Sequence, residues 1–374
     1  MKIGIDARMY SPAFTGIGRY VKELTDNLFR LDTENEYVLF LNKEQYDSFT
    51  PPNDRVKKVC SEAGYYSLKE QTIFLKEIMK EKLDLMHFTH FNSPILYPKK
   101  SIVTIHDLTL SKFPGKKMTK WYHRLGYHAT VRAALSKATH IIAVSQNTKK
   151  DIVELKGSPE EKISVIYESV GEEFTVLSET TVQAHLEKYN LQPEQYFLYT
   201  GVWRDHKNVV GMIHAFAEIV KNNPGYKLVM TGKEDPYYPE VLEAIAHHKL
   251  EDSIILPGIV PEEDLIALYN GALCYVFPSF YEGFGLPPLE AMRCHTPVIA
   301  SNTSCIPEIT GADNALYFDP HNTIEIANRM QQIIDEPETR KKLIKNGIYH
   351  VQTFSWEKMA QETLDIYKKI STRK

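Results

Sequence analysis

Two acidic side chains flank a glycine-containing loop in the second half of the chain. Glu282 and Glu290 are separated by seven residues within the stretch FPSFYEGFGLPPLE, residues 277–290. Neither carboxylate suits a phosphate, because like charges repel, but each can accept hydrogen bonds from two hydroxyl groups. This spacing therefore predicts a site that recognises the hydroxyl groups of a sugar or a ribose.

The backbone between the two carboxylates suits a phosphate instead. Gly283 and Gly285 leave room for a ligand to approach the amides of Phe284, Gly285 and Leu286. Pro287 fits the first turn of a helix, whose partial positive charge adds to those donors. A tight loop with a capping and a solvated glutamate would explain one acidic pair alone. Two glycines, two prolines and two acids within nine residues favour a functional site for a sugar nucleotide.

This loop lies between an expected strand and an expected helix. The apolar run LCYVF, starting at Leu273, is typical of a buried parallel strand, and the helix is expected from Pro287. Other strands, alternating with helical patterns, are expected at 2–6, 37–41, 85–88, 102–105, 163–166, 196–201, 227–232, 254–260 and 297–301. The pattern predicts open parallel sheets, in which ligands bind at the carboxyl ends of the strands.

Several histidines stand near these strand ends. His106 and Asp107 follow the strand that starts at residue 102, and a residue there faces the crevice of a doubly wound sheet. His106 is therefore a candidate acid, base or binding residue. His87 and His90 also follow a strand end and fit a site role or a structural role equally well. His140, before the run IIAV, is expected to be structural.

Two glycines open the helix expected after the first strand. Gly16 and Gly18 occupy a position that can bind a phosphate. Val21 replaces the third glycine of the G-x-G-x-x-G pattern, so a dinucleotide site and a nucleotide-dependent oxidoreductase are disfavoured. For Gly16, a turn that requires positive φ is the alternative.

Length and composition indicate a two-domain globular protein. At 374 residues the chain exceeds the size at which single cores stop growing. Its four cysteines lack C-x-x-C spacing, which favours free thiols in a reducing cytosol. The N-terminus has charges where a signal peptide needs an apolar core, and no apolar run reaches about eighteen residues. We therefore expect a cytoplasmic protein without a membrane span, with a polar linker at 168–193.

A basic segment covers residues 99–150. It holds eleven Lys or Arg residues against one acid, Asp107, and Phe113, Trp121, Tyr122 and Tyr127 lie among them. The imbalance in a chain of net charge −4 favours an anionic partner, such as the inner face of a membrane. No nucleic-acid motif accompanies the segment, so nucleic acid is not expected. A solvated surface that balances acidic residues elsewhere is the alternative.

Glu282 and Glu290, together with the sequence GFGLPPLEAM that follows Glu282, resemble the E-x7-E signature of retaining glycosyltransferase family 4. Members of this family have the GT-B fold. The resemblance implies two Rossmann-like domains facing a cleft. It implies an acceptor domain at 1–180, a donor domain at 181–352, and a last helix at 353–374 that returns to the first domain. The implied reaction transfers a hexose from a nucleoside diphosphate sugar to a hydroxyl group, with retention of configuration.

The resemblance also implies roles for single residues. Lys207, in VWRDHKN, is similar to the family lysine that neutralises the donor diphosphate, and Arg204 is the nearest arginine because Val202 stands at the usual arginine position. His106, Lys207 and Glu282 are the expected catalytic residues. The remaining expected donor contacts come from the glycine before the first helix, the base-binding segment and the acidic loop, namely Gly16, Val260, Gly283, Phe284, Gly285, Leu286 and Glu290.

The donor and acceptor classes follow from the same resemblance. GDP-mannose is the expected donor, with UDP-sugars next, and a glycan or lipid-linked sugar is the expected acceptor. No cofactor is expected, and no metal, because Asp-x-Asp is absent from the sequence and Lys207 with the loop amides can share the charge of the leaving group. The alternatives are a storage-glucan or sucrose-type glucosyltransferase using a UDP- or ADP-sugar, and a non-catalytic module that binds a sugar nucleotide.

Overall fold

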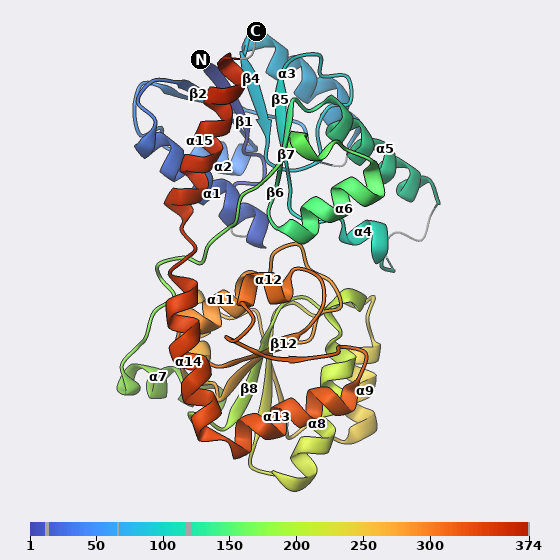
Figure 1. The fold of residues 1–374 in the computed structure, drawn as a ribbon, viewed down its shortest axis with the longest axis vertical. Helices are drawn as coiled ribbons and strands as arrows, with labels where there is room; N and C mark the ends of the chain where they lie inside the picture. Colours follow the sequence, from blue (N-terminus) through green and yellow to red (C-terminus); the bar gives the residue numbers. More distant parts are fainter. Residues whose placement is uncertain (12–14, 66, 117–120, 373–374) are drawn as a thin grey trace. The chain divides into compact units, whose positions relative to one another are not determined.

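The computed structural model describes residues 1–11, 15–65, 67–116 and 121–372, which fall into two compact units (Figure 1). Unit 1 consists of Met1–Ser111, Met118–Glu168 and Ser355–Lys374, and unit 2 of Lys112–Lys117 and Ser169–Phe354. The crossing between Glu168 and Ser169 comes earlier than the boundary expected at 180. Within the described ranges, no helix is long and apolar enough to cross a membrane.

The described part of unit 1 is built on a seven-stranded sheet whose neighbouring strands are all parallel. Buried residues fill most of these strands, as expected where helices cover both faces. The strand order is β3-β2-β1-β4-β5-β6-β7. The strands are β1 Lys2–Asp6, β2 Glu36–Leu41, β3 Val56–Cys60, β4 Leu85–Phe88, β5 Ser101–Ile105, β6 His140–Ala143 and β7 Ile163–Val165.

Helices cover this sheet, and each face has its own apolar core. Successive strand residues point to opposite faces, so Leu39 belongs to one core and Phe40 to the other. A π-helical turn, Glu70–Phe74, continues directly into an α-helix, Leu75–Lys80. The helices of the unit are α1 Thr15–Leu31, α2 Lys43–Ser48, α3 Leu75–Lys80, α4 Thr109–Lys112, α5 Trp121–Lys137, α6 Gln146–Lys156 and α15 Trp356–Thr372.

The last helix belongs to unit 1. Helix α15, red in Figure 1, packs beside α1, and Leu364 and Tyr367 join the same core as β1 and α1. The Tyr367 hydroxyl lies 2.6 Å from His87 Nδ1. The chain therefore returns to its first unit through a helix that completes one face of the core, the placement that the family resemblance implies for this helix.

The described part of unit 2 contains a six-stranded sheet, also parallel throughout. Its order is β10-β9-β8-β11-β12-β13. The strands are β8 Tyr196–Thr200, β9 Lys227–Thr231, β10 Ile254–Gly258, β11 Cys274–Phe277, β12 Val298–Ser301 and β13 Leu316–Phe318. The helices are α7 Glu179–Leu186, α8 Val209–Asn222, α9 Glu240–His248, α10 Glu262–Gly271, α11 Leu286–Arg293, α12 Ile306–Thr310, α13 Thr323–Asp335 and α14 Pro337–Val351.

The segment expected as a linker, 168–193, begins at the crossing between the units and contains α7. Ser178 caps this helix by accepting a hydrogen bond from Thr181 N, and Val182 and Leu186 are buried. A Cβ atom added to Gly271 of α10 would lie 2.7 Å from Leu186 Cδ1, so the two helices are in close contact. Packing of two apolar side chains against a glycine therefore outweighs the polar composition.

Each sheet has one point where the strand order reverses direction. In unit 1 this point lies between β1 and β4, and in unit 2 between β8 and β11. Chains that leave neighbouring strands in opposite directions open a crevice at the carboxyl ends, where ligands of open α/β sheets bind. A ligand site is therefore expected in the segments that follow these four strands.

Candidate active site

The loop after β11 carries most of the expected donor residues. Helix α11 begins at Leu286, one residue before the expected start, with a proline in its first turn. Gly285 caps this helix with φ 94°, and an added Cβ atom would lie 3.2 Å from the ring of Phe277. A glycine is required at this position both by the backbone conformation and by the close approach of the ring.

Lys207 and Glu282 form an ion pair at the reversal point of unit 2. Lys207 ends a short turn, Asp205–Lys207, that follows β8, and Glu282 follows β11. Lys207 Nζ donates to both carboxylate oxygens of Glu282, at 2.7 and 3.0 Å. The lysine side chain is 19% exposed and the glutamate side chain 11% exposed, so a ligand that enters the site can reach a partly desolvated pair of charges.

The main chain of Glu282 is fixed by the loop after β12. Its amide donates to Ser304 Oγ at 3.2 Å, and its carbonyl accepts from Ser304 Oγ at 2.7 Å and from Cys305 Sγ at 3.3 Å. Ser304 adopts φ 58°, a left-handed conformation. Burial raises the pKa of the Cys305 thiol, which stays protonated and acts as a donor. Sequence reasoning missed both residues because their role depends on the contact between two loops.

Glu290 is held from the core side. Tyr269 donates its hydroxyl proton to Glu290 Oε2 at 2.8 Å, and the same hydroxyl lies 3.1 Å from Thr200 Oγ1. Burial raises the pKa of Tyr269, and the charge of Glu290 raises it further, so the hydroxyl remains a donor. Two hydroxyl groups, of Thr200 at the end of β8 and Tyr269 in α10, therefore orient Glu290. The sequence around Glu290 gives no sign of these contacts.

The other expected donor residues of unit 2 are at its surface. Arg204 is exposed at the start of the turn that carries Lys207. Val260 is partly buried two residues after β10, beside Ile259, which is 77% exposed. An exposed isoleucine at the carboxyl end of a strand is compatible with the apolar shelf expected for a nucleobase, which stays a prediction.

In unit 1, His106 follows β5 as expected and is buried. Its Nδ1 lies 2.9 Å from Glu168 Oε1, and its Nε2 lies 2.9 Å from the carbonyl oxygen of Thr89. Burial lowers the pKa of His106, but the hydrogen bond and the charge of Glu168 outweigh burial and raise it above its ordinary value. Sequence reasoning did not identify Glu168, which comes from the segment after β7.

The expectations for the neighbouring histidines are resolved by their contacts. His87 lies inside β4, so its expected place after a strand end is wrong, and it bonds Tyr367 and Thr104 Oγ1 within the core. Burial lowers the pKa of His90, which does follow β4, to about 3. His140 begins β6 and bonds Ser164 Oγ at 2.9 Å, in line with its expected structural role.

The glycines at the start of α1 have different environments. Gly16 lies in the first helical turn, so the turn with positive φ that was its alternative is not adopted. An added Cβ atom on Gly18 would lie 1.9 Å from the carbonyl oxygen of Ser11. Gly18 is therefore required for the close approach of the preceding loop, and the phosphate role of Gly16 stays a prediction.

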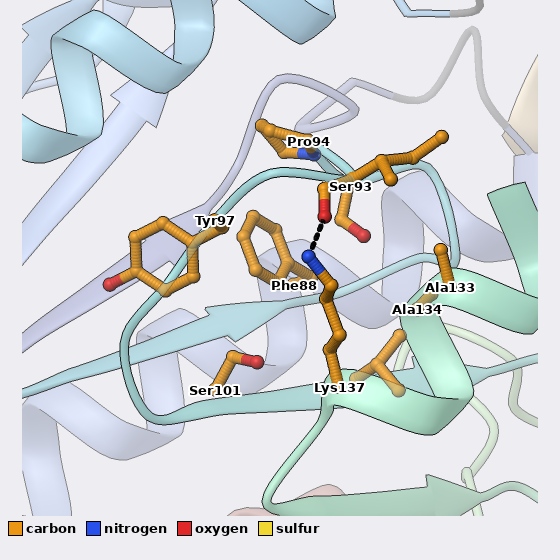
Figure 2. A pocket seen from close by; sticks show the side chains of 10 residues that line it. Phe88, Ser93, Pro94, Tyr97, Ser101, Ala133, Ala134 and Lys137 are labelled. Atoms are coloured by element: carbon orange, nitrogen blue, oxygen red, sulfur yellow. Dashed lines mark hydrogen bonds between the residues drawn. The ribbon is translucent and has the colours of Figure 1, made fainter.

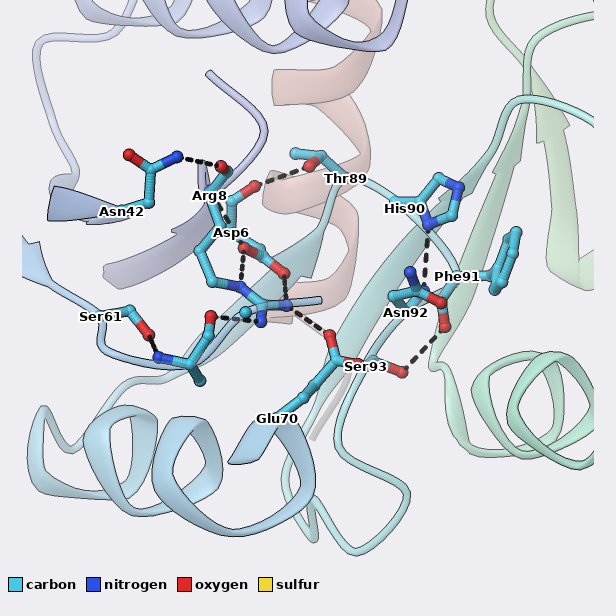
Figure 3. A network of polar contacts seen from close by, with 12 residues as sticks. Asp6, Arg8, Asn42, Ser61, Glu70, Thr89, His90, Phe91, Asn92 and Ser93 are labelled. Carbon is cyan, nitrogen blue, oxygen red and sulfur yellow. Dashed lines mark hydrogen bonds and ion pairs between the residues drawn. The ribbon is translucent and has the colours of Figure 1, made fainter. Parts of the chain in front are cut away.

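Polar side chains surround a pocket at the reversal point of unit 1, where β1 and β4 end (Figure 3). Arg8 binds Asp6 through two hydrogen bonds of 2.8 Å and Glu70 through one of 2.7 Å. The pocket is lined by Asp6, Arg8, Met9, Tyr65, Thr89, His90 and Asn92. Among the described residues, Asn92 Nδ2 is buried without a hydrogen-bond partner. A buried amide donor beside a carboxylate suits a ligand hydroxyl group.

A second hollow lies between β4, β5 and α5 (Figure 2). Lys137 reaches across it and donates to the carbonyl oxygen of Ile95. Burial raises the pKa of the Tyr97 hydroxyl to about 12. None of the expected site residues lines this hollow.

Across the described ranges, no group of three or more His, Cys, Asp or Glu side chains is arranged to hold a metal ion.

The basic segment is only partly described, because Lys117 and Lys120 lie outside the described residues. Within it, Lys116 pairs with Glu240 at 2.6 Å, and Lys149 pairs with Glu160 at 3.2 Å.

Two family models match successive parts of the chain. Residues 14–174 match Glycosyltransferase Family 4, and residues 182–350 match Glycosyl transferases group 1. Among related sequences, the O-antigen chain mannosyltransferase B of Escherichia coli is 27% identical over 387 residues, covering 98% of this chain and 100% of the relative.

Solved structures share the architecture. Sucrose-phosphate synthase of Thermosynechococcus elongatus gives a TM-score of 0.80 at 22% identity, covering 100% of both chains. HepE of Anabaena, in complex with UDP and glucose, gives a TM-score of 0.79 at 16% identity, covering 99% of this chain and 100% of that chain. These likenesses confirm the predicted GT-B fold. Because the two family models together span most of the chain, the chain belongs to family 4 of the glycosyltransferases.

Proposed function

We propose that this protein transfers a mannosyl residue from GDP-mannose to a hydroxyl group of a growing polysaccharide, with retention of configuration. The ion pair between Lys207 and Glu282 at the reversal point of unit 2 is the observation that carries the proposal. It unites two residues expected separately from sequence. The full-length similarity to an O-antigen mannosyltransferase supports the choice of mannose and of a polysaccharide acceptor.

In the proposed donor complex, unit 2 holds the diphosphate and the two sugars. The phosphate oxygens accept hydrogen bonds from the amides of Phe284, Gly285 and Leu286, at the first turn of α11. Lys207 turns part of its hydrogen bonding from Glu282 to the diphosphate, whose charge grows as the glycosidic bond breaks. Glu290 accepts hydrogen bonds from the ribose hydroxyl groups. Glu282, released in part from Lys207, accepts a hydrogen bond from a hydroxyl group of the transferred hexose.

The acceptor side of the proposal rests on the pocket between the ends of β1 and β4. The Asn92 amide is a buried donor without a described partner, and the Asp6 carboxylate lines the same pocket. A sugar hydroxyl group can accept from the first and donate to the second. The tested variant is Asn92→Ala, which should raise the KM for the acceptor and leave the KM for the donor unchanged.

The experiment that tests the proposed reaction is a donor screen. Purified protein is incubated with GDP-mannose, UDP-glucose or ADP-glucose and a synthetic mannoside acceptor, and nucleotide release is measured with and without EDTA. Release from GDP-mannose that EDTA leaves unchanged is the expected result. Preferred use of UDP-glucose or ADP-glucose would favour a glucosyltransferase, and donor binding without release would favour a non-catalytic module.

We propose that the protein attaches to an anionic membrane and carries out this reaction at the membrane surface. Helix α5 exposes Trp121 (73%) and Leu125 (61%), and Arg132 follows them on the same helical face. Aromatic side chains favour the membrane interface, and each cation near an anionic surface contributes about 1 kcal/mol. Lys116 contributes less than its charge suggests, because it is paired with Glu240.

Liposome sedimentation tests this attachment. Binding to vesicles with anionic lipid should weaken as salt rises and fall in the Trp121→Ala, Arg132→Glu double variant. The matched control is Lys221→Glu, which changes an exposed lysine of unit 2. Equal recovery of the wild-type protein in the supernatant with neutral and anionic vesicles at low salt would contradict the proposal.

A further inference from the structure

His106 is enclosed by hydrogen-bond acceptors on both sides of its ring. The carbonyl oxygen of Thr89 lies 2.9 Å from Nε2, and the carboxylate of Glu168 lies 2.9 Å from Nδ1. Both His106 and Glu168 are buried, so water does not replace either contact. A carbonyl oxygen cannot donate, so Nε2 must carry a proton.

The proton between Nδ1 and Glu168 has two possible positions. In one, the ring is an imidazolium facing a carboxylate, and in the other a neutral ring accepts from a carboxylic acid. An isolated imidazole has a pKa of about 6.5 and an isolated glutamic acid side chain about 4.3, so the proton favours the ring. Because the second nitrogen already donates to a carbonyl oxygen, the cationic form is also the one that the Thr89 contact stabilises.

The other groups that face the ring come from its own loop, from α1, and from β4 with the segment after it. Asp107, on the same loop, adds negative charge that favours the cation. From α1, Tyr20 contacts the ring edge-on with centroids 4.7 Å apart, and burial keeps its hydroxyl protonated. From β4 and the segment after it come His87 and His90, and burial lowers the pKa of each to about 3, so both are neutral. The charged groups that raise the pKa of His106 are therefore the carboxylates of Glu168 and Asp107.

We propose that Glu168 is a positioning residue that holds His106 as a doubly protonated imidazolium at the carboxyl end of β5. Both N–H groups are used within unit 1, so the ring supplies a fixed positive charge and cannot remove a proton from the acceptor hydroxyl group. Glu168 also ends the segment of unit 1 that precedes the crossing to unit 2, so the same ion pair anchors the chain where it leaves this sheet. The part of this inference that concerns turnover rests on the proposed glycosyltransferase reaction.

The protonation state can be measured without any substrate. Histidine is labelled with ¹⁵N, and the ring of His106 is identified as the signal lost in His106→Gln. At pH 7.5, both ring nitrogens of His106 should show the shift of a protonated nitrogen. A neutral ring with one protonated nitrogen in the wild-type protein would overturn the proposal, whatever the activity proves to be.

Variants of Glu168 test its positioning role. In Glu168→Gln the charge is lost, so the pKa of His106 should fall and the ring should be neutral at pH 7.5. Glu168→Asp keeps the charge and should retain the imidazolium. If transfer activity is found, kcat of Glu168→Gln should fall at least tenfold at pH 7.5 and recover as the pH is lowered, whereas the aspartate variant should keep the wild-type profile.

These outcomes separate the inference from the proposed function. An imidazolium in a protein that releases no nucleotide from any donor would leave the inference standing and refute the proposed reaction. Transfer activity with a neutral His106 would do the reverse. Should Glu168→Gln fail to fold, the wild-type spectrum and the Glu168→Asp variant still decide the question.

Discussion

Replacing Lys207 by methionine removes the cation from Glu282 while keeping the length and volume of the side chain. Breaking a buried ion pair costs about 3–5 kcal/mol, and an exposed pair contributes about 0–1 kcal/mol. With side chains 19% and 11% exposed, this pair lies between those cases, and we expect a loss of about 2 kcal/mol in the free energy of unfolding. The loss should be smaller in Glu282→Gln, because a lysine of this exposure can still reach water.

The catalytic effect of the same change should be larger. Removing one group that stabilises developing charge lowers kcat by about 10²–10³-fold, and the leaving diphosphate gains charge as the bond breaks. Urea denaturation followed by circular dichroism gives the stability, and nucleotide release gives kcat. The matched control is Lys221→Met, which breaks a pair with Glu218 of the same 2.7 Å length between exposed side chains and should cost under about 0.5 kcal/mol.

Two results would refute this reasoning. Equal stability losses in the two lysine variants would mean that burial of the pair at the reversal point has no energetic consequence. Unchanged kcat in Lys207→Met would mean that the lysine does not meet the leaving group. A double-mutant cycle with Glu282→Gln should give a coupling energy of about 1–2 kcal/mol, since the two side chains are in direct contact.

Three further predictions follow from the surrounding structure. Glu290→Gln should weaken donor binding by about 1.5–3 kcal/mol in titration calorimetry, because an anionic acceptor for hydroxyl groups is lost; unchanged affinity would contradict its role. Gly285→Ala should cost roughly 1–3 kcal/mol of stability and weaken donor binding, since φ 94° is unfavourable for alanine and the new Cβ atom would crowd Phe277; wild-type behaviour in both assays would show that the loop relaxes freely. Burial raises the pKa of Asp264, but hydrogen bonds from Lys188 and its neighbours lower it to about 2, so its stabilising effect should be present above pH 4 and lost as the pH falls towards 2; Asp264→Asn should lack this acid-dependent loss in urea denaturation.

The strands were predictable because parallel strands buried on both faces are written as apolar runs. The run from Leu273 and the run at 85–88 illustrate this, and both form strands at the expected positions. Strand β3 was missed because it lies at the edge of its sheet and carries two lysines in VKKVC. Helix α7 was missed because only two of its residues are buried, and its packing partner, Gly271, is far along the chain.

The site was predictable as separate residues but not as contacts. Lys207 and Glu282 were each expected from their own loops, yet their ion pair arises because β8 and β11 are neighbours in the sheet. Glu168 and Asn92 gave no local signal, since their roles depend on which strand ends lie together. Sequence patterns report which face of an element is buried, whereas contacts between loops follow from the order of strands.

Proton NMR of the transfer reaction tests the central claim most directly. The protein is incubated with GDP-mannose and methyl α-mannoside, and the anomeric signals are followed from the start of the reaction. The account predicts formation of GDP together with a new α-linked mannosyl signal. The Glu282→Gln variant should give neither the α-linked nor the β-linked product, and added divalent metal should not restore either. A β-linked product, or no consumption of GDP-mannose under conditions where UDP-glucose or ADP-glucose is consumed, would contradict it.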